Sequence, residues 1–149
     1  MVETVKIIRF HAEKCRGHYD CEKACSQVQF GDDTGGDHSA IRIVKSNGGF
    51  SMVNCDQCGL CIDVCPVQAL KRLPSGVVTV NKELCIGCMS CVAFCPVDGM
   101  RRAKGMVYPH KCISCGACVR ACPEGALELV EVPISEVERV VYYHQGVCD

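Results

Sequence analysis

The chain has 149 residues and a formal net charge of −1, and sixteen of its residues are cysteine, far above ordinary usage. A chain of this length forms one domain or two small ones, and four Phe, four Tyr and no Trp leave little material for an aromatic core. No basic stripe is present to bind nucleic acid, and no apolar run is long enough to span a bilayer.

Two kinds of protein use cysteine this heavily: secreted disulfide scaffolds and metal-binding proteins of reducing compartments. The first residues, MVETVKIIRFHAEKC, contain neither the apolar stretch nor the small-residue cleavage site of a secretory signal. We therefore expect a cytoplasmic location, free thiols and metal ligation.

In chain order, the pattern predicts short strands that alternate with cysteine-rich loops. Strands are expected at residues 4–10, 41–44, 77–80 and 126–132. A polar, glycine-rich loop is expected at residues 30–39, and helical turns at residues 60–64 and 90–94. The tail from Ile134 onward is predicted to form a short amphipathic helix.

A run of four cysteines with the spacing C-x2-C-x2-C-x3-C-P occurs three times. The copies are Cys55, Cys58, Cys61 and Cys65; Cys85, Cys88, Cys91 and Cys95; and Cys112, Cys115, Cys118 and Cys122. Three thiolates on one tight loop meet at a single cubane, and the fourth is carried by a helical turn to the other cluster of a pair. Zinc sites use pairs of ligands, and thiols at this spacing are poorly placed to form disulfides with one another. The repeat therefore predicts [4Fe–4S] clusters.

A degenerate copy, KCRGHYDCEKAC, precedes the regular ones and contains Cys15, Cys21 and Cys25. His18 stands where the repeat has its second cysteine. A neutral imidazole can ligate iron, and it makes a cluster less negative and easier to reduce. Two alternatives stay open: Cys148 completes the ligand set from the tail, or this cluster has three irons.

Other histidines and a group of basic residues are interpreted as surface residues without a role in metal binding. The histidines at positions 11, 38, 110 and 144 have no ligand-like neighbours at a fixed spacing, so we expect them at the surface without a function. The basic residues Arg101, Arg102 and Lys104 are interpreted as a solvated turn.

Together the motifs resemble those of the four-cluster ferredoxin-like subunits of multisubunit oxidoreductases. That family serves formate dehydrogenases, nitrate and dimethyl sulfoxide reductases, hydrogenases and tungsten-containing aldehyde oxidoreductases. The matching stretches are KCRGHYDCEKAC, GGFSMVNCDQCGLCIDVCPVQAL, VNKELCIGCMSCVAFCP and HKCISCGACVRACPEGAL. The resemblance implies an α+β fold of two bacterial-ferredoxin-like modules, one inserted within the other. The outer module is expected at residues 1–40 and 104–133, the inserted module at 41–103, and a C-terminal tail at 134–149.

The resemblance also implies that the second motif pairs with the third and the first with the fourth, so that four [4Fe–4S] clusters are the expected cofactors. The implied ligand sets are Cys55, Cys58, Cys61 and Cys95; Cys65, Cys85, Cys88 and Cys91; Cys25, Cys112, Cys115 and Cys118; and Cys15, His18, Cys21 and Cys122.

No phosphate-binding loop or nucleophile motif is visible, so the chain by itself is not expected to be an enzyme. The resemblance implies a subunit that transfers electrons between a large catalytic subunit and a redox partner, such as a flavin subunit or a ferredoxin. We favour a tungsten- or molybdenum-pterin aldehyde oxidoreductase as the catalytic subunit. A hydrogenase or formate dehydrogenase partner, a diffusible polyferredoxin and an iron–sulfur redox sensor are the alternatives.

Overall fold

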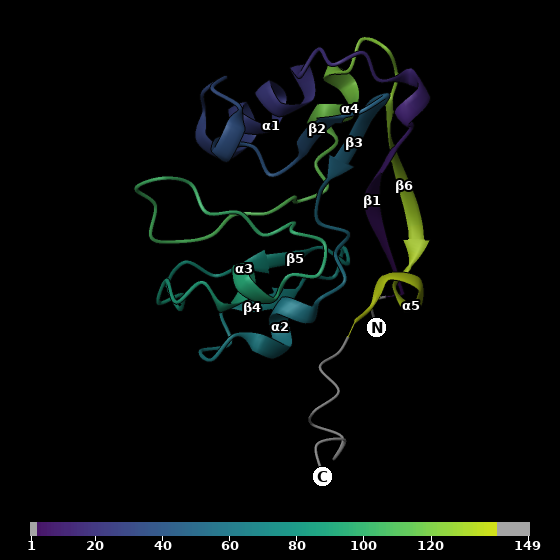
Figure 1. The fold of residues 1–149 in the computed structure, drawn as a ribbon. Coiled ribbons are helices and arrows are strands. Elements are labelled where there is room, and N and C mark those ends of the chain that lie inside the picture. Colours follow the sequence, from purple (N-terminus) through teal and green to yellow (C-terminus); the bar gives the residue numbers. More distant parts are fainter. Residues whose placement is uncertain (1–2, 140–149) are drawn as a thin grey trace.

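The structure is a computed structural model that describes residues 3–139. Short helices and small antiparallel sheets make the chain an α+β protein, as the sequence predicts. Strand β1 (Thr4–Phe10) pairs with β6 (Leu127–Pro133), so the two ends of the described chain lie side by side (Figure 1). Within the described residues, no helix combines the length and the apolar character needed to cross a membrane.

Two further hairpins complete the strands. β2 (Arg42–Ser46) pairs with β3 (Gly49–Val53), and β4 (Leu70–Arg72) pairs with β5 (Val78–Val80). All four predicted strands are therefore present, with ends that move by one or two residues. Strands β3 and β4 were not predicted, because the first contains glycine and serine and the second is only LKR.

Four helices follow the cysteine loops: α1 (Asp20–Phe30), α2 (Leu60–Val64), α3 (Ser90–Phe94) and α4 (Ala117–Ala121). Proline follows the last cysteine of each regular motif, and α2, α3 and α4 end at the residue before that cysteine. Ser26 follows Cys25 instead, so α1 continues past this cysteine to a total of eleven residues and is capped by Gly31, whose φ is 75°. The predicted loop at residues 30–39 is therefore shortened at its start, and it contains a 3₁₀ turn at Gly36–His38.

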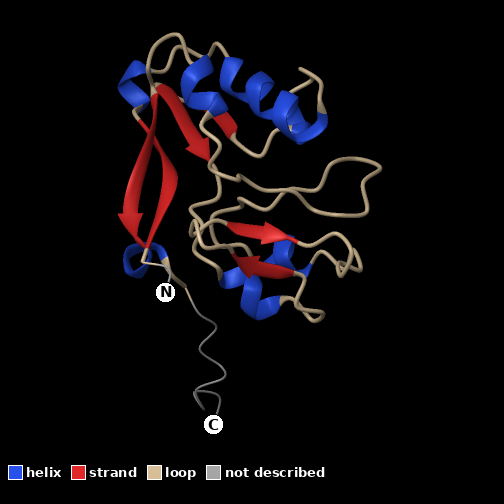
Figure 2. Ribbon diagram, turned by 180° about the vertical axis from the view of Figure 1, so that it is seen from behind, coloured by secondary structure: helices blue, strands red, loops and turns tan. Residues whose placement is uncertain are grey.

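The chain forms two lobes beside the β1–β6 sheet (Figure 2). In the α1–α4 lobe, α1 packs on α4 and the β2–β3 hairpin; in the α2–α3 lobe, α2 packs on α3 and the β4–β5 hairpin. The turn of the β4–β5 hairpin lies against β1, since a Cβ atom on Gly76 would come within 2.7 Å of Val5 Cβ. After β6, the short helix α5 (Ile134–Val137) leads to Arg139, which binds both carboxylate oxygens of Asp56 at 2.8 and 3.0 Å.

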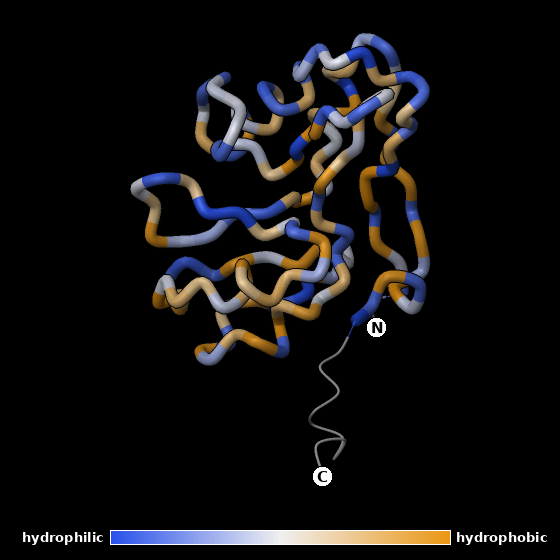
Figure 3. Tube along the Cα trace, in the orientation of Figure 1, coloured by the Kyte–Doolittle hydropathy of each residue, from blue (hydrophilic) through white to orange (hydrophobic). Residues whose placement is uncertain are grey.

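Cysteine side chains belong to the hydrophobic core of both lobes. Cys21 and Cys118 are buried with Ile8, Ile41 and Leu127 in the α1–α4 lobe. In the α2–α3 lobe, Cys91 is buried with aliphatic residues of β4 and β5. Apolar segments line the β1–β6 sheet and both lobes (Figure 3). The core is therefore aliphatic and sulfur-rich, as the scarcity of aromatic residues indicates.

Three of the histidines expected at the surface, His11, His38 and His110, are half-buried instead, and the last two meet at Phe30. His38 stacks on Phe30 with ring centroids 4.3 Å apart, and His110 meets the same ring edge-on at 5.0 Å. His110 Nε2 lies 2.8 Å from the carbonyl of Asp37, and burial lowers the pKa of this imidazole. These residues therefore help to join the loop after α1 to the segment before Cys112, whereas His144 lies outside the described residues.

Candidate metal centres

The three regular motifs share one backbone conformation, which explains their spacing. In each motif, the residue before the second cysteine and the residue after it both have positive φ. These residues are Gln57 and Gly59, Gly87 and Met89, and Ser114 and Gly116. Such left-handed residues bend the chain sharply, and a helix that carries the third cysteine starts immediately afterwards. The loop therefore curls around one point in space.

The degenerate first motif has the same conformation. Gly17 has φ 75° and Tyr19 has φ 60°, and helix α1 begins at Asp20, the second residue after His18. A Cβ atom on Gly17 would lie 2.6 Å from the ring of Phe50, so a side chain there would displace this ring. His18 thus occupies the backbone position that the second cysteine has in the regular motifs.

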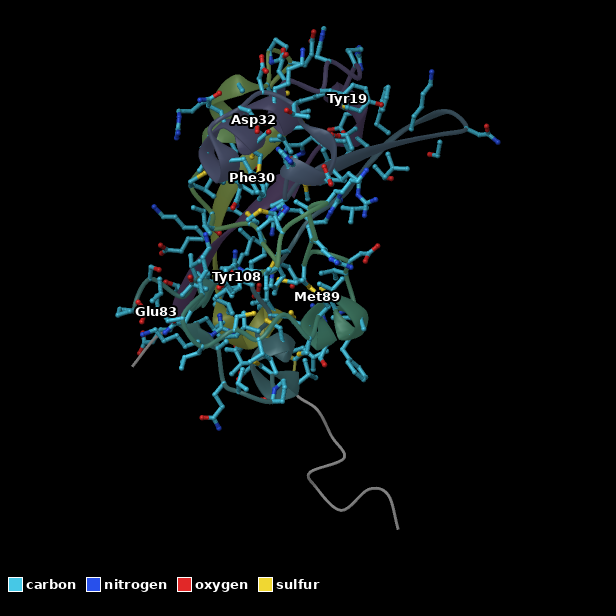
Figure 4. All side chains as sticks on the ribbon, turned by 90° about the vertical axis from the view of Figure 1, so that its left-hand side faces the viewer. Tyr19, Phe30, Asp32, Glu83, Met89 and Tyr108 are labelled. Atoms are coloured by element: carbon cyan, nitrogen blue, oxygen red, sulfur yellow. The ribbon has the colours of Figure 1, made fainter. Side chains whose placement is uncertain are left out.

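Three cavities are each lined by four cysteines, and each combines three cysteines of one motif with the last cysteine of another. The groups are Cys55, Cys58, Cys61 and Cys95; Cys65, Cys85, Cys88 and Cys91; and Cys25, Cys112, Cys115 and Cys118. Sulfur atoms accordingly lie inside the molecule at several levels along its length (Figure 4). In residues 3–139, no group of three or more His, Cys, Asp or Glu side chains could hold a single metal ion.

The remaining three cysteines of the motifs, Cys15, Cys21 and Cys122, lie near one another in the α1–α4 lobe. Cys15 and Cys122 pack on the core that contains Cys21. Burial raises the pKa of Cys21 to about 12, and the charges of Glu22, Cys122 and Cys15 act in the same direction, whereas a hydrogen bond from the Glu22 backbone opposes the rise. His18 Nε2 lies 3.3 Å from Glu124 Oε1, two residues after Cys122. Cys148, the alternative fourth ligand, lies outside the described residues.

Comparison with protein families decides what these groups are. One model of the 4Fe-4S dicluster domain matches residues 77–123, and a second matches residues 54–99 and 111–149. The chain belongs to the 4Fe-4S dicluster family. It is a ferredoxin-like iron–sulfur protein with four [4Fe–4S] clusters.

Several curated proteins are similar to this dicluster protein over about half of its length. The B subunit of anaerobic dimethyl sulfoxide reductase from Haemophilus influenzae is 31% identical over 98 residues, which cover 53% of this protein and 46% of the relative. The uncharacterized ferredoxin-like protein YdhX of Escherichia coli O157:H7 is 34% identical over 93 residues, which cover 56% of this protein and 42% of the relative. The probable anaerobic dimethyl sulfoxide reductase subunit YnfG of Escherichia coli K12 is 28% identical over 95 residues, which cover 52% of this protein and 45% of the relative. The match therefore spans less than half of each relative.

Backbone N–H groups are directed at the thiol sulfurs of this dicluster protein. The second residue after the first cysteine of each regular motif donates to that cysteine: Gln57 to Cys55 at 3.3 Å, Gly87 to Cys85 at 3.4 Å and Ser114 to Cys112 at 3.4 Å. The last cysteines receive N–H groups in the same way: Cys65 from Ala69, Cys95 from Gly99, Cys122 from Ala126 and Cys25 from Ala40. Such donors stabilise the negative charge of an iron-bound thiolate.

Burial disfavours thiolates in the absence of iron. It raises the pKa of Cys61 to about 12 and those of Cys55 and Cys91 to about 11, and it raises the pKa of Cys118 further. Buried thiols are therefore protonated at neutral pH without metal, and cluster ligation releases their protons. Cys88 differs, because its sulfur is exposed and the neighbouring Ser90 lowers its pKa.

The buried side-chain amide of Asn54 indicates whether the residues around Cys112 suit an iron–sulfur cluster. Asn54 is 8% exposed, and neither polar atom of its side chain has a hydrogen-bond partner within the described residues. This amide lies close enough to the Cys112 thiol to lower its pKa, although burial dominates and raises it. Buried amides need partners, and cluster sulfur is an acceptor of the right kind. The donor set therefore fits the cluster that the family binds.

Proposed function

We propose that this chain is the electron-transfer subunit of a multisubunit oxidoreductase and works in the cytoplasm. Its four clusters pass single electrons between a catalytic subunit and an external redox partner. The observation that carries the proposal is the presence of cysteine-lined cavities in both lobes. Fully ligated clusters leave no iron open for substrate, so the chemistry at either end belongs to cofactors on other subunits.

The proposed ligands are fifteen cysteines and one histidine in four sets. They are Cys55, Cys58, Cys61 and Cys95; Cys65, Cys85, Cys88 and Cys91; Cys25, Cys112, Cys115 and Cys118; and Cys15, His18, Cys21 and Cys122. The cavity linings support the first three sets, and the shared backbone conformation of the first motif supports the fourth.

The proposed architecture is one ferredoxin-like module inserted within another. Pairing of β1 with β6 supports it, because these strands enclose everything between them in the sequence. The β2–β3 hairpin contributes Ile43, Phe50 and Met52 to the core of the α1–α4 lobe. We therefore propose that the inserted module starts near residue 54 rather than at residue 41.

An exposed apolar surface supports a docked subunit over a freely diffusing ferredoxin. Leu84 and Ile86 are 49% and 61% exposed, and both lie on the segment that leads to Cys88. Val107, 60% exposed, touches the same loop, since a Cβ atom on Gly87 would lie 2.9 Å from its carbonyl oxygen. A partner that covers this surface comes close to the cluster of Cys88 and can exchange electrons with it.

The names of the relatives narrow the choice of catalytic partner. Two of them are subunits of anaerobic dimethyl sulfoxide reductases, which favours an anaerobic reductase. The motif resemblance implies a second hypothesis. Here the catalytic partner is a tungsten- or molybdenum-pterin aldehyde oxidoreductase, and the redox partner is a flavin subunit or a ferredoxin. Both hypotheses are consistent with the absence of a catalytic motif in this sequence.

Anaerobic purification of the native protein tests the proposal. We expect co-purification with a larger subunit that contains molybdenum or tungsten, and about sixteen iron and sixteen sulfide per copy of this chain. A monodisperse single chain with the same iron content indicates a diffusible polyferredoxin instead. Iron sufficient for only two clusters contradicts the four-site assignment.

The crossed ligand sets predict which cluster each last cysteine serves. In Cys65→Ala, we expect the cluster of Cys85, Cys88 and Cys91 to become a three-iron cluster or to be lost, while the cluster of Cys55 stays intact. The measurement is iron content together with electron paramagnetic resonance (EPR) of the oxidised and reduced protein. Cys95→Ala is the matched control, because it should damage the Cys55 cluster and spare the other. Damage to the Cys55 cluster in the Cys65 variant would contradict the crossing.

A further inference from the structure

Lys111 is a buried lysine between the two lobes. Its residue is 3% exposed, and its Nζ donates to Gln57 Oε1 at 2.6 Å, to the Val78 carbonyl at 2.5 Å and to the Cys112 carbonyl at 2.8 Å. Three donated hydrogen bonds need three hydrogens on the nitrogen, which only the ammonium form has. Lys111 therefore carries a full positive charge in the interior.

No ion pair balances this charge within the described residues. The ion pairs found there involve His11, His18, His38, Arg42 and Arg139. All three acceptors of Lys111 are neutral amide or peptide oxygens. An unpaired charge in the interior is strongly destabilising unless an opposite charge lies nearby. The folded chain therefore needs a negative group close to Nζ.

The sulfur sites supply that negative group. Lys111 lines the cavity of Cys55, Cys58, Cys61 and Cys95, and it directly precedes Cys112 of a second set. The one carboxylate on the same cavity wall, Asp56, is already held by both of its oxygens on Arg139. An oxidised cluster with four thiolates carries about −2, and its reduced form one charge more.

Gln57 holds the ammonium in this position and joins the two sets. It is 0% exposed, accepts hydrogen bonds from Lys111 and from the Val78 N–H through Oε1, and donates through Nε2 to the Cys112 carbonyl at 2.8 Å. One buried side chain from the Cys55 loop thus reaches the Cys112 loop of the other lobe. The charge lies at the junction where an electron crosses between lobes.

We propose that Lys111 is the shared counter-charge of the Cys55 cluster and the Cys112 cluster and raises the reduction potentials of both. The proposal rests on the ligand sets given under the proposed function. A positive charge stabilises the reduced cluster more than the oxidised one, because the reduced cluster holds one more electron. Both clusters are thereby easier to reduce than they would be beside a neutral side chain, and because both potentials rise together, neither cluster becomes a trap for the electron.

The test compares Lys111→Met with Lys71→Met, a control at an exposed lysine on β4. Iron and sulfide are measured first, and the potential of each cluster is then determined by EPR-monitored redox titration of the complete protein. In Lys111→Met we expect two clusters to become harder to reduce by about tenfold each, or about 59 mV for a one-electron couple. The other two clusters, and all four in the control, keep their potentials.

A second variant keeps the test decisive if Lys111→Met fails to assemble. Gln57→Glu retains the ammonium and places a carboxylate against it, so it should lower the same two potentials while the iron content stays at four clusters. Four retained clusters with unchanged potentials in either variant would overturn the role of Lys111. Fewer than four clusters in the unaltered protein would instead overturn the proposed function, so the two failures are distinguishable.

Discussion

Removal of the four clusters is expected to unfold the whole chain in one cooperative transition. Cysteines occupy the core of both lobes, and the largest fully buried side chains of residues 3–139 are Ile41, Gln57, Val5 and Val78. Metal binding contributes on the order of 10 kcal/mol in structural zinc sites, which is as large as the whole stability of a small domain. A chain with so thin a core has no comparable source of stability once its iron is gone.

The measurement uses an iron chelator under reducing, anaerobic conditions, followed by far-ultraviolet circular dichroism and limited proteolysis. Chelator already saturated with iron is the control, and it should leave both signals at their native values. A cluster-free chain that keeps the native spectrum and its protease resistance would show that the protein core alone maintains the fold.

Replacing His18 by alanine is expected to convert one cluster to a three-iron form or to remove it. His18 occupies the position of a ligand cysteine, and its Nε2 contacts the Glu124 carboxylate. Histidines that bind metal commonly donate one ring N–H to a carboxylate and coordinate through the other nitrogen. We assign the proton to Nε2 from this contact, which leaves Nδ1 for iron. The measurement is the iron content and the EPR spectrum of the oxidised protein.

His18→Cys and Cys148→Ser are the matched variants. His18→Cys should keep four clusters and lower the potential of one, because a thiolate adds a negative charge that the imidazole lacks. Cys148→Ser should leave the cluster count and all potentials unchanged. Loss of a cluster in Cys148→Ser together with an intact count in His18→Ala would show that the tail supplies the ligand and that His18 does not.

Regular features of the fold could be predicted from the sequence, because a local pattern determines them. Helices α2 and α3 have the predicted bounds, and strand β1 covers the predicted residues. Helix α1 was not predicted, although a signal is present: Ser26 stands where the other motifs have proline, so no proline ends the helix there. Strand β4 could not be predicted, since its three residues are a strand only through pairing with β5.

The surroundings of the clusters depend on contacts between distant residues, and the sequence does not reveal them. Lys111 looks like an ordinary residue before a motif, and only the fold brings Gln57 to it from 54 positions away. Glu124 approaches His18 from 106 positions away. Asn54 was missed for the same reason, because an asparagine before a cysteine carries no signal of burial. Spacing is thus enough to propose ligands, whereas the groups that surround them cannot be predicted from the sequence.

The pairing of β1 with β6 determines the order in which parts of the chain can fold during synthesis. Ribosomes extend a chain at about 5–20 residues per second from the N-terminus, so β1 emerges well before its partner, and His11 precedes its contact Glu128 by 117 residues. The α2–α3 lobe has all eight of its motif cysteines between Cys55 and Cys95 and can receive iron and sulfide while translation continues. Cys15, Cys21 and Cys25 emerge first but meet Cys122 and the Cys112 loop last. The thiols that are made earliest therefore need protection from oxidation for the longest time.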